Sequence, residues 1–570
     1  MSDTPQPIQP YDPFRVGSSG SSSIPSFVTA VLSPSGGDDG AQIIAAVAAV
    51  NAAGRGTIIF GPGNYTVYTV GQSYGTLGAF LNCNGLKLLS YGARVAVDPA
   101  RIFSAGFNDF FTFQDNDNVV IDGFDAVGTL TATNVTNGNV YGPGFLRFRH
   151  GNTNVSMPSN RVTGLVAGVS FDNNNAGAYD GNPTTRGIHI GVLRVQTSIY
   201  GIDSQYSGDD MVIEALITDT VHRDFFIYGC QNVTANIHSK DAKGDGVKLW
   251  SGNGRGLSNI RINYSSDATS TARTNSGSLV TLEFNSDGVN TVTHRNIWIN
   301  FDVTLPGAGT NNTGFAVFLI RKILNGGASD IVDRGHILDG LTLTGSIRNY
   351  TNGGAGVGTI DVDNTSKWGT VLDSWYNIRL ENLRLFDSKY CRFSCAALKG
   401  AFTVSQFSSI WNGTLAADLV LDQQSYAGAL DATYPKAGKI EIRNSIYDNQ
   451  YTFNSLTGNL SSNVIELQAD ATAGVGWGDG HVITNNGTGA TATLTIQPAI
   501  VGRSYGPLVR VVTQTFRIAP QAADKITGAS AVNKYISLDA DGMAIKLVCY
   551  HPGVWYVEYY GSPSNVSFQA

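Results

Sequence analysis

Short runs of alternating apolar and polar residues, each opened by an asparagine, recur through the middle of the chain. The clearest runs are Asn118–Ile121, Asn232–Ala235, Asn259–Asn263, Asn296–Asn300 and Asn377–Leu380. Asparagine tolerates the left-handed backbone of a turn, and a period of two is typical of a half-buried strand. Each run therefore predicts a turn followed by a β-strand.

These runs repeat at a regular interval between residues 190 and 250. Leu193–Val195, Ile213–Ile217 and Val233–Ile237 align at one constant offset, with Leu193, Ile213 and Val233 in equivalent positions. A unit this short cannot close a core of its own, so it must stack on its neighbours, and strands that repeat along one axis stack in parallel. We therefore expect an all-β fold, a right-handed parallel β-helix. The wider spacings from Asn232 to Asn259 and Asn296 predict loops inserted into the coils.

Both ends of the chain depart from this pattern. Residues 1–35 are rich in proline and serine and predict a flexible arm. Asp38 and Asp39 precede Ala41–Ala53, whose apolar residues have helical spacing, and Thr57–Phe60 then reads as a strand. We expect a short capping helix at the start of a β-helix that spans residues 36–455.

The last residues, 456–570, lack the repeat that opens on asparagine and predict a separate, β-sandwich-like domain. Its expected strands carry many aromatic residues and are Leu508–Phe516, Tyr535–Leu538, Ala544–Tyr550 and Val554–Tyr559.

Composition narrows the function. Only 14% of the residues are charged and the net charge is −7, which disfavours a nucleic-acid partner. The polar surface is rich in Asn, Ser, Thr and Gly, which suits hydrogen bonding to sugars. No apolar run approaches the ~20 residues of a membrane span. The five cysteines form no disulfide or zinc pattern, so we expect free thiols, with no metal and no cofactor.

The two ends carry a resemblance to a known family. Gly37–Asp39 followed by Gly54–Tyr65 resembles the N-terminal cap of the pectate-lyase-like superfamily, and Lys546–Cys549 with Val554–Val557 is similar to a strand pair that often ends phage tail proteins. The whole resembles a bacteriophage tailspike. That resemblance implies a homotrimeric virion protein assembled in the host cytoplasm. It would attach to the phage tail or an adaptor protein through its N-terminal arm and depolymerise a bacterial capsule, exopolysaccharide or O-antigen.

Charged residues concentrate between Asp219 and Lys248, and this segment supplies most of the candidate site. The repeat predicts that Asp224 and Asp245 lie close together, and that Asp203 faces outward in the column that carries Phe226 and Lys248. Parallel strands stand ~4.8 Å apart, so carboxylates on adjacent coils would fall near the ~5–5.5 Å of a retaining glycosidase, and those two coils apart near the ~6.5–9.5 Å of an inverting one. The candidate catalytic residues are Asp224, Asp245, Asp241, Asp203 and, in reserve, Glu283.

Residues near this face could bind the glycan, by stacking or by charge-assisted hydrogen bonds to acidic groups. The candidates for substrate binding are Arg223, His222, Lys243, Lys248, Tyr228, Trp250, Arg255 and Tyr206. Gly244–Lys248 also resembles the Gly-Asp-Asp stretch of polygalacturonase-like enzymes, but it lacks the second Asp, so only Asp245 carries over.

Several functions remain open at this point. Hydrolysis by paired carboxylates is the first expectation. A lyase on the same fold would use Lys240, Lys243 or His222 as base, with a cation neutralising the uronate. A receptor-binding spike would use the carboxylates only to hold sugar. A secreted monomeric pectinase is the most distant alternative, because Met1–Pro7 does not resemble a signal peptide.

Overall fold

The computed structural model describes most of the chain. The described residues are 28–71, 75–98, 108–137, 142–172, 182–251, 255–267, 278–286, 291–305, 316–324, 336–350, 359–362, 374–388, 391–394, 400–410, 419–422, 439–443, 446–447, 451–454, 460–461, 464–467, 469–473, 479–485, 491–510, 514–540, 542–559 and 563–569. Residues 1–27 of the expected arm, the expected boundary at residue 455 and Cys395 lie outside them.

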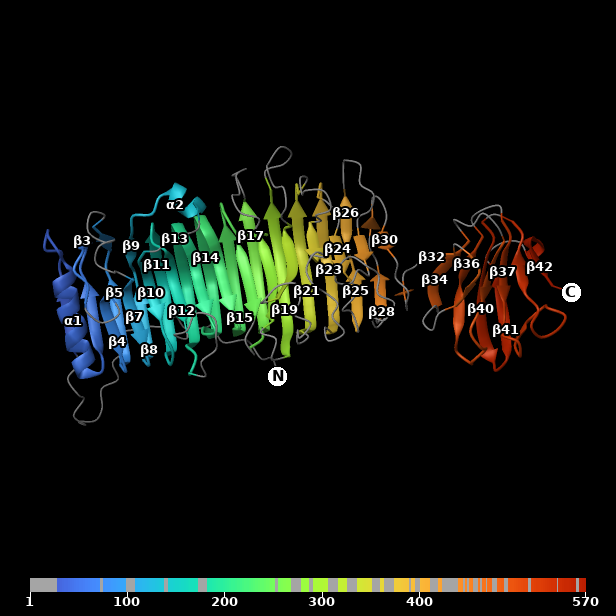
Figure 1. Cartoon of the computed structure of the whole chain (residues 1–570), viewed down its shortest axis with the longest axis horizontal. Helices are drawn as coiled ribbons and strands as arrows, with labels where there is room; N and C mark the ends of the chain where they lie inside the picture. The colour runs from blue at the N-terminus through green and yellow to red at the C-terminus, as the bar shows by residue number, and fades with distance from the viewer. Residues whose placement is uncertain are drawn as a thin grey trace, which may run out of the picture.

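Residues from β1 to β31 wind into a right-handed parallel β-helix, which confirms the expected fold (Figure 1). Every pairing within this sheet is parallel, and each coil contributes strands to up to three faces. Face 1 will carry the candidate site. Its strands are β4 (Thr76–Leu81), β7 (Asp109–Gln114), β10 (Gly144–Phe148), β12 (Ala167–Asp172), the ends of β13 (Arg186–Gln205) and β14 (Asp209–Tyr228), β16 (Val247–Ser251), β18 (Val280–Ser286), β20 (Phe318–Leu324), β22 (Ile360–Val362), β24 (Cys391–Ser394), β27 (Leu419–Asp422) and β30 (Tyr451–Asn454).

Face 2 is the longest of the three. Its strands are β1 (Val28–Leu32), β2 (Gly56–Phe60), β5 (Asn84–Ser90), β8 (Asp117–Asp122), the starts of β11 (Thr153–Thr163), β13 and β14, then β15 (Gln231–Ser239), β17 (Ser258–Asp267), β19 (Val292–Thr304), β21 (His336–Arg348), β23 (Ser374–Phe386), β25 (Ala401–Ser405), β28 (Lys439–Arg443) and β31 (Leu460–Ser461). Face 3 holds β3 (Gly63–Val67), β6 (Ala93–Val97), β9 (Asp125–Val127), the end of β11, β26 (Ser408–Ile410) and β29 (Ile446–Tyr447), among others.

The expected capping helix is present as α1 (Gly40–Ala53), and the strand after it is β2. Ile43, Val47 and Val50 are buried on one side of α1, at the N-terminal end of the coil stack (Figure 1). A Cβ at Gly78 of β4 would lie 2.5 Å from Val47, so glycine is what lets the helix pack this closely on the first coils. A second helix, α2 (Ala132–Asn137), lies in the connection between β9 and β10.

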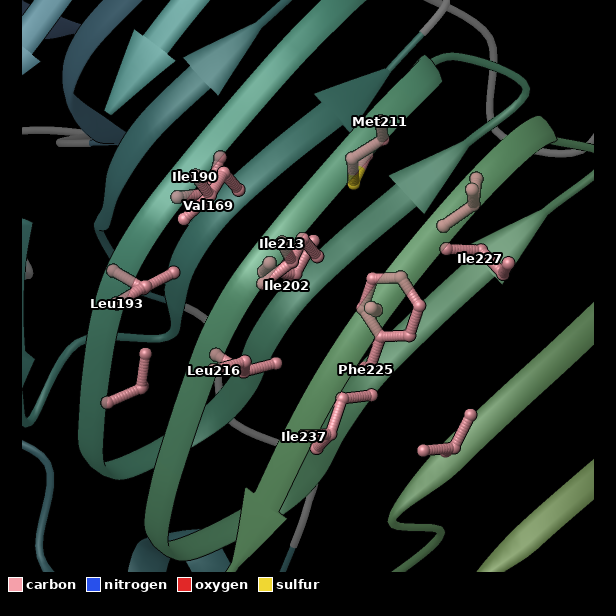
Figure 2. Packing of buried hydrophobic residues seen from close by; sticks show 14 of the residues in the cluster. Val169, Ile190, Leu193, Ile202, Met211, Ile213, Leu216, Phe225, Ile227 and Ile237 are labelled. Carbon is pink, nitrogen blue, oxygen red and sulfur yellow. The ribbon is translucent and has the colours of Figure 1, made fainter. Parts of the chain in front are cut away.

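The core of the β-helix is a stack of aliphatic and aromatic side chains in register. Ile190 lies beside Ile213, and Leu193 lies beside Leu216 (Figure 2). The expected alignment of Leu193 with Ile213 was therefore wrong, as was that of Ile213 with Val233, because Val233 lies beside Met211. The true offset between partners is 23 residues from β13 to β14, as in Ile190 and Ile213, and 22 from Met211 to Val233, so each coil is longer than the repeat read from the sequence.

The asparagines lie in turns at the starts of strands, as the sequence pattern predicted, and they also stack on one another, which was not predicted. Asn232, Asn259 and Asn296 all have positive φ, between 53° and 56°. The side-chain amide of Asn259 donates to Asn232, and that of Asn296 donates to Asn259, at 2.8 and 3.0 Å. Because these asparagines are unequally spaced along the chain, the extra residues between Asn259 and Asn296 are accommodated without shifting the ladder.

The C-terminal residues form two further sheets around a second core. One contains β32 (Val464–Glu466), β34 (Asp479–Thr484), β36 (Ser504–Val509), β40 (Ala544–His551), β41 (Val554–Tyr559) and β38 (Lys525–Ile526). The other contains β33 (Ala471–Thr472), β35 (Ala492–Thr495), β37 (Phe516–Ala519), β39 (Ile536–Leu538) and β42 (Val566–Phe568), and a short 3-10 turn, η2 (Pro563–Asn565), precedes β42.

The expected strand Leu508–Phe516 was wrong, because its ends belong to β36 and β37 in different sheets. Parallel pairing continues from β32 to β36 and from β33 to β37, and antiparallel pairing with β40 and β39 follows. This unit therefore begins with parallel winding and ends mainly in antiparallel pairs, with β38 beside β41 as a parallel exception.

Candidate active site on face 1

The outward positions of face 1 bring chemically distinct residues into register. Asp203 of β13 lies beside Phe226 of β14, and Phe226 lies beside Lys248 of β16, which confirms the expected column. Their neighbours Ile202 and Phe225 point into the core (Figure 2). The column therefore faces away from the core.

Asp172 and Arg147 extend this face by two coils toward the N-terminus. Arg147 lies beside Ser170 in the register of β10 and β12, and Ser170 lies beside Asp203. The Nε of Arg147 donates to Oδ2 of Asp172 at 2.5 Å, and its Nη2 contacts the same oxygen. Arg147 thus holds one oxygen of the Asp172 carboxylate, whose side chain is 17% exposed.

The environments of the neighbouring carboxyl groups differ from that of Asp172. Burial, assisted by the negative charge of Asp172, raises the pKa of Asp203 to about 6, although Gln205 donates to both of its oxygens at 3.1 and 3.3 Å. Burial also raises the pKa of Asp109 to about 7, against the opposing effect of Arg147, whose Nη1 lies 3.6 Å away. Face 1 therefore holds carboxyl groups that stay protonated under mildly acidic conditions beside an ion-paired carboxylate.

The register sets the separation of Asp172 and Asp203. They are on adjacent coils, and the partner of Asp203 is Ser170, which precedes Asp172 on the same side of its strand. Strands ~4.8 Å apart and a rise of ~3.3 Å per residue place the two Cα atoms about 8 Å apart, with both side chains on the same face. Carboxyl groups about 6.5–9.5 Å apart are typical of inverting glycoside hydrolases, which need room for a water molecule.

Arg223 and Asp245 form the next ion pair along this face. Arg223 lies beside Tyr200 in the register, and its Nε is 3.6 Å from Oδ2 of Asp245. The guanidinium carbon lies 5.8 Å from the ring centre of Tyr200 and 5.6 Å from that of Phe226. Thr281 of β18 donates to the other oxygen of Asp245 at 3.3 Å. Two of the predicted site residues, Arg223 and Asp245, are therefore partners of one another.

Lys248 and Glu283 form a third, buried pair. The Nζ of Lys248 lies 3.2 Å from Glu283, and their side chains are only 8% and 1% exposed. Lys248 also lies 4.7 Å from the ring centre of Trp250, which stacks on Tyr228 at 4.8 Å. Glu283, the reserve catalytic candidate, is thus engaged in an ion pair within the protein.

Asp224 is placed differently from the sequence expectation of a group on the outer face. It is fully buried, and the Tyr264 hydroxyl, itself part of the core, lies 3.5 Å from Oδ2. The alternation of buried and exposed positions fails here, because Asp224 and Phe225 are both fully buried while the Arg223 side chain is 26% exposed. Glycines occupy the same position on the flanking coils, and a Cβ at Gly201 would lie 2.2 Å from the Asp224 carbonyl oxygen.

Asp241, Lys243 and His222 lie near the turn between β15 and β16. Lys243 donates to Asp241, so the two side chains neutralise each other. His222 is 5% exposed, and its ring lies against Gly244, where a Cβ would be 2.8 Å away. The glycine that precedes Asp245 therefore has a packing role.

Tyr206 directly follows β13, and Arg255, which precedes β17, contacts it. Arg255 donates to the Tyr206 carbonyl oxygen at 3.0 Å and pairs with Asp209, which also accepts a hydrogen bond from the Gln231 backbone. Tyr206 is fully buried and packs on Tyr228 at 4.1 Å. These contacts join successive coils.

Arg147, Asp172 and Asp109 are not among the residues predicted from the sequence. They lie outside the segment with the highest charge density, and residues 173–181 separate Asp172 from the next described strand. The pattern that would have found them is the outward column itself, followed along the register from Arg147 to Ser170 to Asp203. Among the described residues, no group of three or more His, Cys, Asp and Glu side chains could hold a metal ion. No helix in those residues is long and apolar enough to cross a membrane.

Comparison with known proteins finds similarity in structure. No protein-family model matches the sequence, and no curated protein matches it. The catalytic unit of a GH87 α-1,3-glucanase from Streptomyces thermodiastaticus is 12% identical, with a TM-score of 0.37, over 73% of this chain and 67% of that one.

A variant tailspike protein of E. coli bacteriophage HK620, solved with a pentasaccharide, is 8% identical, with a TM-score of 0.36, over 93% of this chain and 89% of that one. An endo-xylogalacturonan hydrolase from Aspergillus tubingensis is 12% identical, with a TM-score of 0.31, over 76% and 95%. A phage tailspike is thus among the structures that this chain resembles in fold.

Proposed function

We propose that the protein binds a bacterial surface polysaccharide and hydrolyses it with inversion, using Asp203 as the general acid and Asp172 as the general base. The observation that carries this proposal is the pair itself. Two outward carboxyl groups have Cα atoms about 8 Å apart on adjacent coils, and one of them has a pKa raised to about 6.

Each group has a defined proton transfer. Asp203 gives its proton to the glycosidic oxygen as the bond to the anomeric carbon breaks. Asp172 takes a proton from a water molecule, whose oxygen attacks that carbon from the opposite side. Arg147 fixes Oδ2 of Asp172 and so orients the carboxylate. Exchange of one proton with solvent restores both groups.

Elimination fits these residues less well. A lyase base must reach the substrate, but His222 is buried and Lys243 pairs with Asp241. Lys240 is exposed and forms an ion pair with Asp219 at 3.8 Å. A spike that only binds sugar has no need of a carboxyl group whose pKa lies near 6.

The biological setting proposed here rests on the sequence resemblance. A tailspike would be a homotrimer of 60.4 kDa chains, attached to the virion by its N-terminal arm. Light scattering tests the trimer, which requires three times the mass of one chain. A mass near that of a single chain would argue for a monomeric β-helix enzyme.

The activity is tested on a panel of purified bacterial capsules and O-antigens by release of reducing ends. Wild type should cut at least one polymer, and Asp203→Asn and Asp172→Asn should not. Asp302→Asn is a matched control, because it removes a carboxylate from an exposed pair with Arg348 on other strands. Equal activity of Asp203→Asn and wild type would overturn the assignment.

A further inference from the structure

The positive charges of face 1 are already satisfied by the protein. We define the charged strip as Arg147, Asp109, Asp172, Asp203, Arg223, Asp245, Lys248 and Glu283. Each of its three cations lies in an ion pair with a carboxylate of the same chain, at 3.6 Å or less. Arg223, Lys243 and Arg255 were candidates for holding acidic sugar groups, and each of them forms an ion pair with an Asp residue of the protein.

The charge balance of the charged strip does not favour an anionic ligand. Three cations face five carboxyl groups, and Arg149, which follows β10, raises the cations to four. In the form that the proposed mechanism uses, Asp203 is protonated, and Asp109 also keeps its proton below about pH 7. The remaining carboxylates, Asp172, Asp245 and Glu283, then pair one to one with the three cations of the strip, so none of these cations is left unbalanced. A glycan with a carboxylate at the cleaved linkage would displace an existing ion pair and gain little, because desolvating a second anion beside these groups opposes binding.

Arg223 is where this balance could be altered. Its side chain is 26% exposed, and the charged groups that reach it from neighbouring strands are Asp245, through the ion pair, and Asp203, whose pKa it lowers. Arg147 is held by two carboxylates, and Lys248 is nearly fully buried. Asp245 alone among the described groups is in ion-pair contact with Arg223.

We propose that the glycan cut at Asp172 and Asp203 is uncharged at the sugars flanking the cleaved linkage, and that Asp245 enforces this selection by neutralising Arg223. This inference rests on the proposed function of that carboxyl pair. It makes Asp245 a specificity-determining residue, with no part in proton transfer.

The test compares Asp245→Asn with Asp302→Asn. Each variant removes one negative charge from an Asp–Arg pair, the first within the charged strip and the second outside it. Polygalacturonate is the acidic probe and dextran the neutral one, in native affinity electrophoresis at low salt. We expect Asp245→Asn to bind polygalacturonate about two- to fivefold more tightly than wild type, and Asp302→Asn to match wild type.

A second readout is the pH profile on whichever polymer is cut. Without Asp245 the charge of Arg223 is no longer neutralised, so it lowers the pKa of Asp203 further. The fall in kcat/KM above pH 6 should begin at lower pH in Asp245→Asn, and its position should not move in Asp302→Asn. If Asp245 had only a structural role, Asp245→Asn would have lower activity, but its kcat/KM would begin to fall at the same pH as in wild type.

The outcomes separate the inference from the function. Strong retardation of wild type by polygalacturonate, or cleavage beside a uronate, would overturn the neutral-glycan inference while leaving hydrolysis standing. Identical behaviour of Asp245→Asn and Asp302→Asn would overturn the role of Asp245. Full activity of Asp203→Asn would remove the proposed function, whatever the probes show. If Asp245→Asn does not fold, the wild-type measurements alone still decide the charge of the substrate.

Discussion

Two outward columns run along the same coil stack and differ in what they repeat. At the asparagine ladder, successive coils place the same residue in the same left-handed turn, and each amide bonds to the next. One register position of face 1 runs through the charged strip, and successive coils place different residues there: Arg147, Ser170, Asp203, Phe226 and Lys248. The backbone spacing is the same in both columns, but only the ladder repeats its side chain.

The difference separates stability from chemistry. A parallel coil is stabilised when each rung repeats the side chain of the last, because identical amides satisfy one another's hydrogen bonds. In a column whose residue differs from coil to coil, neighbouring side chains do not satisfy one another in this way, and each charged side chain needs its own ion-pair partner. The charged strip meets this cost with ion pairs between unlike residues, which also leave carboxyl groups in two different environments. The following predictions test whether that division holds.

The largest effect is expected from removing the proton donor of the charged strip. Asp203→Asn keeps the shape of the side chain and the contact with Gln205 but has no proton to give. We expect kcat to fall by about 10²–10⁴-fold, with KM and the unfolding temperature near those of wild type. Steady-state kinetics on a cleaved polysaccharide, together with thermal unfolding, would measure both. A large loss of stability with unchanged kcat would place Asp203 among the structural rungs.

The next effect is on the dependence of activity on pH. The acid form of Asp203 has its pKa raised to about 6, mainly by burial. Activity needs that proton, so kcat/KM should fall about tenfold per pH unit above pH 6. The pKa of Asp109, which also lies beside Arg147, is raised to about 7. The variant Asp109→Asn therefore tests whether Asp109 or Asp203 causes the fall in activity. If kcat/KM of Asp109→Asn still falls above pH 6 as in wild type, the fall is due to Asp203. If the fall disappears in this variant, it is due to Asp109.

The same division explains what could be read from the sequence. The fold was predictable because ladder residues such as Asn232, Asn259 and Asn296 repeat, and repetition is visible in one dimension. Asp203 was also reached, because it alternates with core residues on an unbroken strand. Asp224 was misplaced on the outer face because the alternation of buried and exposed positions fails there, where Asp224 and Phe225 are both buried. The glycines at the same position of the flanking coils, Gly201 among them, were the sequence signal for this departure.

Asp172 was missed for a different reason. Its relation to Asp203 crosses the extra residues 173–181, so no constant offset links them. Ion-pair partners such as Arg223 and Asp245 cannot be assigned from spacing either, since several carboxylates were within reach. Columns in which the residue type differs from coil to coil leave no periodic signal in the sequence, and the proposed catalytic residues lie in such columns.

Inside the coils, a stack of unlike residues tests whether departure from repetition always marks chemistry. His294 is fully buried beside Phe284 and His336, with ring centres 4.3 and 5.6 Å away, and those two rings also contact each other at 5.4 Å. Its Nδ1 accepts from the Leu257 backbone, and its Nε2 lies 3.3 Å from the Ser251 hydroxyl. Burial, and then the neighbouring His336, holds the pKa of His294 well below its usual range.

This stack should affect stability alone. Above about pH 6.5 a histidine is neutral in both the folded and the unfolded chain, so the lowered pKa has no effect there. Below it the unfolded chain takes up a proton that the folded chain does not, and stability falls. Between pH 7 and 5, wild type should therefore lose more thermal stability than His294→Asn, which can still accept from Leu257. Equal losses would show that the stack does not couple to protons.

The smallest effect is expected at the ladder. Asn259 supplies both a left-handed turn and two amide hydrogen bonds, and two substitutions separate these roles. Asn259→Gly keeps the backbone conformation and loses the bonds, which should cost about 1 kcal/mol. Asn259→Ala also places a Cβ at a φ of 55°, which adds about 1–2 kcal/mol. The unfolding temperature should be highest for wild type, lower for Asn259→Gly and lowest for Asn259→Ala. The value of kcat/KM should be the same in all three proteins, because the ladder lies on face 2 and the carboxyl pair on face 1. A change in kcat/KM at Asn259 would mean that the two columns are coupled through the coil, and that repeated residues do more here than stabilise the fold.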